Sequence, residues 1–508
     1  LRARLAALIP ASCGLCEAHS LHSLGLEILR ANGGAIGLTS DFSIAEAARR
    51  AAMLASELQI GRSKAESLLR TISLIKRTGG EAKGETSAAL AAYRRLAREG
   101  NFVDFDDLIA LAVELFEAHS DITAGWRQRF RHICVDEFQD VDQQQYRLLR
   151  LLTPPEGNIC VIGDPDQAIY GFRGASADCF CRFVEDFPAA QVLRLGRNYR
   201  STGTIVAASA AVIGAKAPFE TTRPRGSPVA HYVAANEREE ATFIADEIER
   251  LIGGHDLLTA NRGATEARPV SFADFAVLYR TDAQSTALRE AFDAAGIPFK
   301  KSSPQPIAGD PAVNAILRVL PGQKAAGDLA SRIEAAAAAA QGIGEELDAT
   351  NLAQARWRLL ALAASVSDER RLLEEVALAT EADFWDERAD RVSLLTMHAA
   401  KGLEFAVVFI AGLEDGLTPF SFRAFGETAN SQAAPSEEEG EERRLFYVAM
   451  TRAKDLLVLT RAERRYWRGE IRSREASRYL ARIPEGLVDR PRLAGRAPRA
   501  KVRQYSLF

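Results

Sequence analysis

The sequence has few of the features that a membrane-spanning or disulfide-stapled protein needs. Its longest apolar run, residues 405–413, is about half the length of a membrane-spanning helix. Residues 1–10 carry two arginines and no sustained apolar core, so we expect no secretory signal. Six cysteines in 508 residues are too few for a disulfide scaffold of this size. We therefore expect a protein without membrane contact that works in a reducing cytoplasm.

A strong excess of one charge is also absent. The chain has 64 Lys and Arg residues against 68 Asp and Glu residues, and a formal net charge of −4 is not typical of a nucleic-acid binder. Net charge is a weak guide in a large protein, because one basic channel can lie on an acidic body. Between Arg461 and Arg503 there are 14 basic residues against 5 acidic ones. That local excess fits two interpretations, a solvated and partly disordered tail or a nucleic-acid contact.

Short apolar segments separated by helical stretches predict the fold class. At about 100–200 residues per domain, 508 residues indicate two to four domains. Residues 45–98 have the Ala-, Leu-, Arg- and Glu-rich spacing of helices. Apolar strands that alternate with helices predict a parallel α/β sheet covered on both faces, with ligands at the carboxyl ends of the strands. We expect the strands at residues 132–136, 158–164, 192–195, 275–279, 406–410 and 456–459.

Residues 300–390 differ in composition from the rest of the chain. They contain an uninterrupted alanine run at 335–340 and few strand signals, which predicts a small helical insertion between two α/β stretches. Residues 424–439 carry Ser, Asn, Pro and several acidic side chains, a composition typical of an exposed loop.

Two adjacent carboxylates follow the first expected strand, in the segment Val135-Asp136-Glu137-Phe138-Gln139-Asp140. An aspartate at a strand end suits Mg²⁺, directly or through its waters. The neighbouring Glu137 could accept a proton from an attacking water. The alternative is a pair of surface acids at a strand end, and this segment alone leaves both interpretations open.

A glycine-rich loop follows the next strand, with the sequence GDPDQAIYGFRGA at residues 163–175. It places Gln167 beside whatever the carboxylates bind, and it also carries Tyr170, Phe172 and Arg173. Aromatic side chains interleaved with arginine suit stacking on unpaired bases. The alternative for Tyr170 and Phe172 is ordinary core packing.

Three further segments carry polar chemistry, LGRNYRS at 195–201, LTMHAAKGLEF at 395–405 and EERRLFYVAMTRAK at 441–454. Two separated arginines in them, Arg200 and Arg452, could both neutralise a transferring phosphoryl group. An isolated arginine is more often a surface ion-pair partner, so spacing alone does not decide the matter.

Taken together, these five segments resemble motifs II to VI of superfamily 1 DNA helicases of the UvrD/Rep/PcrA type, in the same order. Ser20-Leu21-His22-Ser23 is similar to the upstream Thr-x-His segment of that family, and residues 102–108 resemble its Asp-Phe-Asp-Asp-Leu. The resemblance runs from the first residue to about Thr460. It implies an α/β fold with two RecA-like parallel-sheet motor domains and helical insertions.

The resemblance also implies domain boundaries. The first RecA-like domain would span 1–190, without its N-terminal phosphate-binding segment and with a helical 1B insertion at about 40–100. The remaining parts would be the second RecA-like domain at 191–299 and 391–461, a reduced helical 2B-like insertion at 300–390, and a basic flexible tail at 462–508.

The catalytic roles of the family can be carried over residue by residue. Asp136 would hold Mg²⁺, and Glu137 would activate water. Gln167 would sense the γ-phosphate and couple it to the DNA site. Arg200 and Arg452 would stabilise the transition-state charge.

The binding roles carry over in the same way. The ATP-binding residues would be Tyr199 on the adenine, Glu404 on the ribose, and Gly402. Position 172 is Trp in many relatives, and phenylalanine keeps the stacking face but loses area, so stacking there should be somewhat weaker. The single-strand track would be lined by His22, Phe105, Tyr170, Phe172, Arg173 and His398.

The activity that the resemblance implies is an ATP-dependent 3′–5′ DNA helicase and single-stranded DNA translocase. Its cofactors would be ATP and Mg²⁺, its partners single-stranded DNA and single/double-strand junctions, and its place the bacterial cytoplasm, associated with the nucleoid. It would act in DNA repair, replication or recombination. The competing interpretation is an ATPase-inactive DNA-binding or scaffold protein.

One feature of the family is missing. No G-x-x-x-x-G-K-[ST] occurs in the sequence. Without the backbone N–H groups and the lysine of that P-loop, the β- and γ-phosphates of ATP lack their main ligands. Because the P-loop and motif Ia precede the quoted segments in the family, we expect an N-terminally truncated sequence with little ATPase activity of its own. A natural chain without ATPase activity is the alternative.

The segment Cys13-x-x-Cys16-x-x-His19-x-x-His22 contains zinc-type ligands. On a helix these residues would extend over ~13.5 Å and drift around the axis, which is too far for four donors ~2.3 Å from one ion. We therefore do not expect zinc there.

The last five residues resemble the Q-x-x-L-F peptide by which bacterial DNA-processing proteins dock on the replication sliding clamp. Leu507 and Phe508 would enter an apolar pocket, and Gln504 would hydrogen-bond at its rim. The alternatives are a chance match or packing of Leu507 and Phe508 on the second domain.

Overall fold

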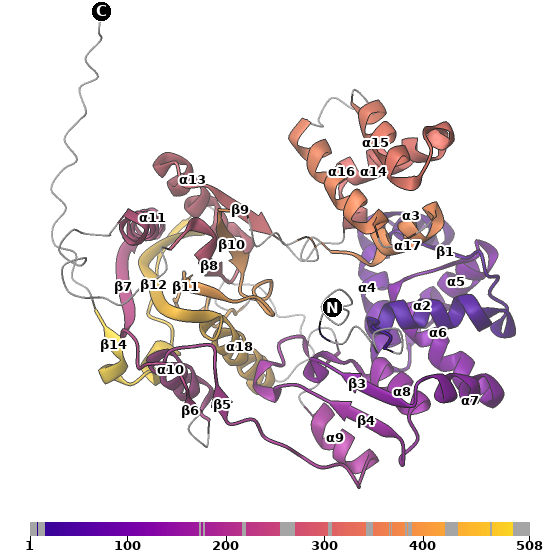
Figure 1. The fold of residues 1–508 in the computed structure, drawn as a ribbon, viewed down its shortest axis with the longest axis horizontal. Coiled ribbons are helices and arrows are strands. Elements are labelled where there is room, and N and C mark those ends of the chain that lie inside the picture. Colours follow the sequence, from indigo (N-terminus) through magenta and orange to yellow (C-terminus); the bar gives the residue numbers. More distant parts are fainter. Residues whose placement is uncertain are drawn as a thin grey trace, which may run out of the picture. The chain divides into compact units, whose positions relative to one another are not determined.

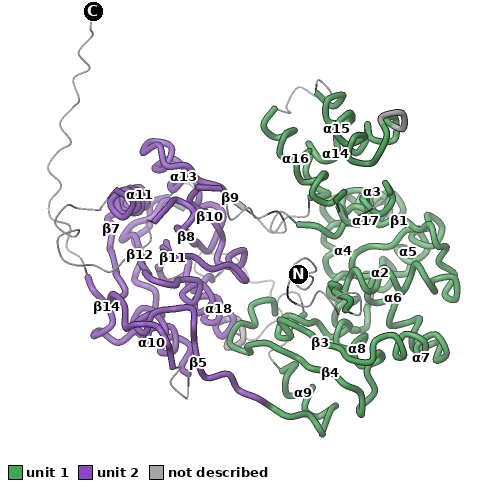
Figure 2. Tube along the Cα trace, viewed as in Figure 1, with its two compact units in different colours: residues 1–192, 304–385 green, residues 193–303, 386–508 purple. Residues whose placement is uncertain are grey.

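The computed structural model divides into two compact units (Figure 2). Unit 1 comprises residues 1–192 and 304–385, and unit 2 comprises residues 193–303 and 386–508. The residues that the structure describes are 8, 16–171, 174–175, 178–215, 220–253, 270–302, 307–341, 349–364, 366, 368–380, 384, 389–421, 435–467 and 470–490.

Unit 1 contains a pair of parallel strands, β3 (His132–Val135) and β4 (Asn158–Val161), which lie side by side (Figure 1). A short 3-10 turn follows each strand, η3 (Phe138–Asp140) and η4 (Pro165–Gln167). One face of the pair packs on α8 (Gln143–Leu152) and α9 (Cys179–Asp186). That core is formed by Val135, Phe138, Tyr146, Leu149, Phe183 and Phe187.

A second core of unit 1 lies between α2 (Leu21–Asn32), α6 (Phe105–Ala118) and α7 (Ser120–Arg129). Gly25 allows the close approach of α2 to α6, because a Cβ at this position would lie 2.3 Å from the Leu108 carbonyl oxygen. A capping box between Asp104 and the third residue of α6 fixes where that helix begins.

Residues 45–98 are helical as expected. They form α3 (Ala47–Leu58), α4 (Arg62–Thr78) and α5 (Gly84–Glu99), and the short parallel pair β1 (Ser43–Ile44) and β2 (Phe102–Val103) joins their ends. A buried ion network ties these helices to the start of α6. In it, Asp104 accepts hydrogen bonds from Lys76 and Arg50, both at 2.9 Å, and from the Tyr93 hydroxyl at 2.6 Å.

Residues 307–378 are mainly helical, and this segment packs with unit 1 although unit 2 flanks it in the sequence. Arg30 on α2 donates two hydrogen bonds to Glu374, 344 residues away, and Leu378 joins the core around Leu29. Its own core comprises Ile316, Ile333, Leu359 and Leu372. Its elements are η8 (Ile307–Gly309), α14 (Pro311–Val319), η9 (Leu320–Ala326), α15 (Leu329–Ala340), α16 (Ala349–Ala363) and α17 (Glu369–Leu378).

Unit 2 is built on one large sheet in the order β14-β7-β12-β11-β8-β10-β9, parallel throughout, with β13 antiparallel to β12 (Figure 1). Apolar side chains fill both faces, as the strand runs predict. The strands are β7 (Val229–Asn236), β8 (Phe275–Tyr279), β9 (Phe299–Ser302), β10 (Val392–Thr396), β11 (Phe405–Ile410), β12 (Ala453–Trp467), β13 (Glu470–Ser473) and β14 (Val488–Asp489).

The remaining elements of unit 2 cover that sheet or connect its strands. The short pair β5 (Arg197–Asn198) and β6 (Glu220–Thr221) stands apart from it. The helices and 3-10 turns are α10 (Gly203–Ile213), α11 (Glu237–Gly253), η6 (Phe272–Asp274), η7 (Asp282–Gln284), α13 (Ser285–Ala295), α18 (Pro435–Met450), η12 (Leu480–Arg482) and η13 (Glu485–Leu487).

Three expectations differ from the structure. The loop expected at 424–439 ends earlier, because α18 begins at Pro435, and residues 424–434 lie outside the described residues. Residues 192–195 form no strand, and Val192, Leu193 and Leu195 are exposed where the chain passes from one unit to the other. The basic tail does not begin at residue 462, since β12 continues to Trp467 and β13 and β14 follow. The excess of basic residues does not mark a tail, because basic side chains also lie on strands, where Arg464 is exposed and Arg472 partly exposed, whereas Ala462 and Arg465 are buried.

No helix in the described part of the chain is long and apolar enough to cross a membrane.

Candidate functional site

The structure brings the acidic segment and the glycine-rich loop of unit 1 together at the ends of β3 and β4. The Ile162 N–H donates to the Val135 carbonyl at 2.8 Å, and the Phe138 N–H donates to the Ile162 carbonyl at 2.9 Å. Asp136 and Glu137 follow β3 directly and are exposed. The carboxyl ends of the two strands therefore place these carboxylates beside residues 163–167.

A buried glutamine that the sequence analysis did not single out connects the two segments. Gln139 is 1% exposed, its Nε2 donates to Glu137, and its Oε1 accepts the Asp164 N–H at 3.0 Å. Asp164 in turn accepts a hydrogen bond from Gln167 Nε2 at 2.9 Å. A continuous chain of hydrogen bonds thus runs from Glu137 to Gln167.

Local backbone geometry supports this chain of hydrogen bonds. Glu137 has a left-handed backbone with φ of 50°, which few non-glycine residues adopt, and such conformations concentrate at functional sites. A side chain at Gly163 would displace Gln139, because a Cβ there would lie 2.2 Å from Gln139 Oε1. The positive φ of Glu137 can be seen only once the fold is known, so the sequence alone does not give this signal.

Asp136 fits the magnesium role that the resemblance implies. Its Oδ1 accepts the Glu137 N–H at 3.0 Å, which holds the carboxylate at the strand end. Magnesium usually takes one or two carboxylates and fills its other positions with waters and substrate phosphates, so an exposed aspartate without a protein cage suits it.

Two of the expected DNA-contacting residues meet in unit 1. The rings of His22 and Phe105, at the first turns of α2 and α6, have centroids 5.4 Å apart and a tilt of 58°. Burial lowers the pKa of His22, with Asp106 opposing and Arg77 adding to the shift. His22 is therefore neutral at pH 7 and offers a ring face rather than a charge.

The other expected DNA contacts lie partly outside the described residues. Tyr170 is half-buried, and Phe172 and Arg173 fall outside the described residues.

The end of the glycine-rich loop contacts α8. Ala175 forms a bridge with Asp142, the N-cap residue of α8. Burial raises the pKa of Asp142 to about 6.

In unit 2, residues 197–202 form a tight turn that is bound to β12. Asn198 Oδ1 accepts the N–H groups of Arg200 and Ser201 at 2.8 and 2.9 Å. The Ser201 hydroxyl donates to the Ala453 carbonyl at 2.6 Å, and the Thr202 N–H donates to the Lys454 carbonyl at 2.9 Å. This turn leaves Tyr199 69% exposed and available for a stacking partner.

A half-exposed cluster of charges forms where the three motifs of unit 2 meet. Arg200 Nε lies 2.6 Å from one oxygen of Glu404, and Lys454 Nζ lies 2.6 Å from the other. The hydrogen bond from Lys454 lowers the pKa of Glu404, and the charge of Arg200 acts in the same direction. The sequence analysis missed Lys454, although it follows Arg452 by two residues.

Arg452 has a different environment from Arg200, because it is 2% exposed. Its guanidinium donates to the Val448 and Leu403 carbonyls at 3.0 and 3.2 Å and to the Thr451 hydroxyl at 3.1 Å. The Arg452 carbonyl also accepts the Phe405 N–H at 2.9 Å. In this structure Arg452 joins residues 441–454 to residues 403–405.

The segment after β10 is a compact turn. The Met397 N–H donates to the Tyr279 carbonyl at 2.8 Å, and the Ala399 N–H donates to the Thr396 hydroxyl at 3.2 Å. His398 is half-buried within it. Gly402 has φ of 83°, a value that favours glycine, and this glycine directs the chain back toward Glu404.

Zinc-type ligands of the N-terminal segment are separated in the structure. His19 pairs with Glu17 at 3.1 Å and lies near Glu27, whereas His22 packs on Phe105. Cys16 is exposed, and Cys13 falls outside the described residues. Within the described ranges, Glu17, His19 and Glu27 form the one group of three metal-type ligands, and Arg129 forms ion pairs with both glutamates.

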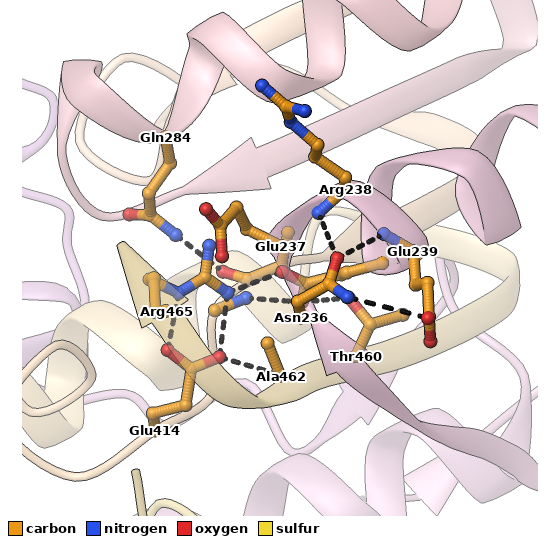
Figure 3. A network of polar contacts seen from close by, with 12 residues as sticks. Asn236, Glu237, Arg238, Glu239, Gln284, Glu414, Thr460, Ala462 and Arg465 are labelled. Carbon is orange, nitrogen blue, oxygen red and sulfur yellow. Dashed lines mark hydrogen bonds and ion pairs between the residues drawn. The ribbon is translucent and has the colours of Figure 1, made fainter. Parts of the chain in front are cut away.

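A second charged cluster of unit 2 is buried at the ends of β11 and β12 (Figure 3). Arg465 donates to Glu414 at 2.6 and 2.7 Å and to Glu240 at 2.5 Å. The carboxylate of Glu240 also accepts the Gly412 N–H and the Thr460 hydroxyl at 2.9 and 2.7 Å. Its charged groups are paired with one another and buried, which indicates a structural role.

Fold and site together define an α/β protein with strand-end carboxylates in one unit and a cationic cluster in the other, the residue types that phosphoryl-transfer enzymes use. Residues 1–188 match the model of the UvrD/REP helicase N-terminal domain, and residues 193–306 and 362–464 match the UvrD-like helicase C-terminal domain. The chain therefore belongs to the UvrD/Rep family, as a UvrD/PcrA-type superfamily 1 helicase.

Similar proteins carry consistent names. The chain is 29% identical to the ATP-dependent DNA helicase PcrA of Leuconostoc citreum, over 92% of this chain and 75% of that protein. It is 31% identical to the ATP-dependent DNA helicase UvrD1 of Mycobacterium tuberculosis, over 97% of this chain and 78% of that protein. The PcrA of Staphylococcus aureus is 28% identical over 92% of this chain and 76% of its own length.

Proposed function

We propose that this chain carries the motor core of an ATP-dependent 3′–5′ DNA helicase that moves along single-stranded DNA. The observation that carries the proposal is the chain of hydrogen bonds from Glu137 through Gln139 and Asp164 to Gln167. Such a chain would let the group that activates water and the group that senses the γ-phosphate change position together. The direction of movement rests on the resemblance to the family.

ATP and Mg²⁺ are the proposed cofactors. When bound, they supply the phosphoryl group whose transfer to water drives the motor. Asp136 would hold Mg²⁺, Glu137 would take the proton of water, and Arg200 and Arg452 would balance charge on the phosphates. Tyr199, Gly402 and Glu404 are proposed contacts of the nucleoside. We add Lys454 to the residues proposed to bind ATP, because Lys454 and Arg200 both pair with the carboxylate of Glu404.

Single-stranded DNA and single/double-strand junctions are the proposed partners. His22 and Phe105 offer adjacent rings on which a base can stack, and Tyr170, Phe172, Arg173 and His398 are proposed to extend this track. Contacts of this kind grip phosphates and base faces, so binding should be independent of sequence and sensitive to salt.

Phe172 gives a direct test of the track. Because one stacked base is worth ~1–3 kcal/mol, Phe172→Ala should weaken binding of an oligothymidine by that amount, and Phe172→Trp should bind at least as well as the parent chain. Fluorescence anisotropy at fixed salt measures both. Trp357→Ala, at a half-exposed tryptophan of the helical insertion, is the matched control and should bind normally. Normal binding by Phe172→Ala would place Phe172 in the core.

The polypeptide of 508 residues is proposed to hydrolyse little ATP by itself, because its sequence contains no P-loop. Phosphate release with and without single-stranded DNA tests this. DNA-stimulated turnover by this chain would overturn the proposal if Glu137→Gln abolishes the turnover. Removal of a catalytic base costs ~10²–10⁴-fold in rate, so such a loss would show that the turnover takes place at this site. DNA binding without any turnover, even when a P-loop segment of a relative is fused in register, would favour the second candidate, an ATPase-inactive DNA-binding protein.

Two further proposals concern cellular context. The protein would act in DNA repair, replication or recombination in the bacterial cytoplasm, associated with the nucleoid. Gln504, Leu507 and Phe508, which lie outside the described residues, would dock on a sliding clamp. A pull-down with a bacterial clamp should succeed for the parent chain and fail for the double variant Leu507→Ala, Phe508→Ala. Equal capture of both chains, or of neither, would remove the clamp proposal.

A further inference from the structure

Two cysteines lie directly opposite each other on the strands of unit 1. In the parallel register of β3 and β4, Cys134 pairs with Cys160. Both are free thiols and both are exposed. Neighbouring strands are ~4.8 Å apart, which lies within the ~4.4–6.8 Å between Cα atoms that a disulfide spans.

The two thiols also point to the same side of the sheet. Side chains alternate along a strand, and the flanking residues Ile133, Val135, Ile159 and Val161 pack toward the core formed with α8 and α9. Cys134 and Cys160 therefore project from the opposite face, where the sequence neighbours on the same face, His132 and Asn158, are exposed as well.

We propose that Cys134 and Cys160 form a reversible disulfide when the protein meets a peroxide. The thiolate of one cysteine attacks a peroxide oxygen and breaks the O–O bond, which gives a sulfenic acid and, for hydrogen peroxide, a hydroxide that takes up the proton released by this thiol and becomes water. The thiolate of the second cysteine attacks the sulfenic sulfur and forms the S–S bond, and the departing hydroxide takes up the proton of the second thiol to become the second water. Two thiols are oxidised by two electrons, and the peroxide is reduced. A dithiol reductant reverses the step.

The proposed disulfide would lie close to the acidic segment and the glycine-rich loop of unit 1. Cys134 lies two residues before Asp136, and Cys160 lies four residues before Asp164, so the bond would join β3 to β4 just ahead of both functional segments. The proposal itself rests on strand register and exposure and does not depend on helicase activity.

Peptide mapping tests the proposal directly. Because Cys13 and Cys16 are close in sequence and could compete, the parent for the test is the Cys13→Ser chain. After treatment with hydrogen peroxide at pH 8, denaturing thiol titration should fall from five thiols to three and recover with dithiothreitol. Mass spectrometry of unreduced digests should show the peptides of Cys134 and Cys160 joined within one chain.

Single substitutions supply the controls. Cys134→Ser and Cys160→Ser should each abolish the joined peptides, whereas Cys181→Ser, at an exposed cysteine on α9, should leave them unchanged. Absence of the joined peptides from the parent chain would overturn the proposal. So would loss of the thiols as sulfinic acids, or as bonds between two chains. The parent chain alone decides the result if a variant fails to fold.

Discussion

Two of the clusters of unit 2 in which arginine meets glutamate differ in both exposure and charge balance. In the cluster of Arg465, the side chains of Arg465, Glu240 and Glu414 are at most 7% exposed, and two carboxylates share one cation. In the cluster of Glu404, the side chains are 35–41% exposed, and one carboxylate is shared by two cations, Arg200 and Lys454.

The difference separates a structural ion network from a cluster whose charges can exchange partners. A buried charge must be paired in the folded protein, since its lost hydration is not restored otherwise. Burial raises the pKa of Glu414, with Arg465 opposing the shift, which shows how costly the second carboxylate is there. Half-exposed charges can exchange one partner for another at small cost, and a surplus of positive charge suits an anionic ligand such as a phosphate.

The largest effect is expected from removing the cation of the buried cluster. Arg465→Ala leaves Glu240 and Glu414 without their partner and should lower the free energy of unfolding by ~3–5 kcal/mol. Urea unfolding followed by fluorescence measures the change. Arg472→Ala is the matched control, because Arg472 forms an exposed pair with Glu470 at 3.0 Å and should cost at most ~1 kcal/mol. Equal losses in the two variants would contradict the distinction between the clusters.

A buried carboxylate outside both clusters sharpens the role of burial. Asp142 is 9% exposed and caps α8, and burial raises its pKa to about 6 from the ordinary 3.8. The folded state then binds this proton more tightly than the unfolded state. The contribution of Asp142 to stability is therefore present below about pH 4 and falls as the pH rises to about 6, by ~2–3 kcal/mol in total.

Asp142→Asn keeps an oxygen that accepts the Gln145 N–H and removes the titration. The free energy of unfolding of the parent chain should fall relative to that of the variant between pH 4 and pH 7. Asp328→Asn is the control at the exposed N-cap of α15, where the hydrogen bond from Ser331 lowers the pKa. Its relative change should have the opposite sign and should occur below about pH 4, with little change between pH 4 and pH 7. The same pH dependence in both variants would show that burial does not govern Asp142.

Local features of this molecule could be predicted from its sequence, and long-range ones could not. Strands such as β8 and β11 are continuous apolar runs, which buried parallel strands require, and Asp136 and Asp164 follow such runs directly. The ion pair of Arg30 and Glu374 joins residues that are 344 positions apart, and no periodic pattern in the sequence predicts it. Glu404 and its two partners come from three separate motifs, so only the fold shows that Lys454 belongs with Arg200.

The missed and mistaken elements have a common physical cause. The charge count predicts a basic flexible tail at 462–508, yet Arg465 is buried because it pairs with two glutamates from distant segments. The apolar residues 192–195 were expected to pair as a strand, but a strand needs a neighbour, and the described chain supplies none there. In both cases the partner, which lies elsewhere in the sequence, decides the structure.

The smallest effect on stability is expected at the exposed cluster, where the effect on binding should be larger. Glu404→Gln removes the charge that Arg200 and Lys454 share but keeps the size of the side chain. The free energy of unfolding should change by at most ~1 kcal/mol, as for other exposed pairs. The two cations then lose their counter-charge, and binding of inorganic tripolyphosphate at low salt should tighten, by up to about fivefold for a change of that size. Isothermal titration calorimetry measures the affinity, with Glu470→Gln, at the exposed pair of Arg472, as the matched control. Unchanged tripolyphosphate binding would show that Glu404 does not restrain the two cations, whereas weaker ATP binding would agree with its proposed contact with the nucleoside.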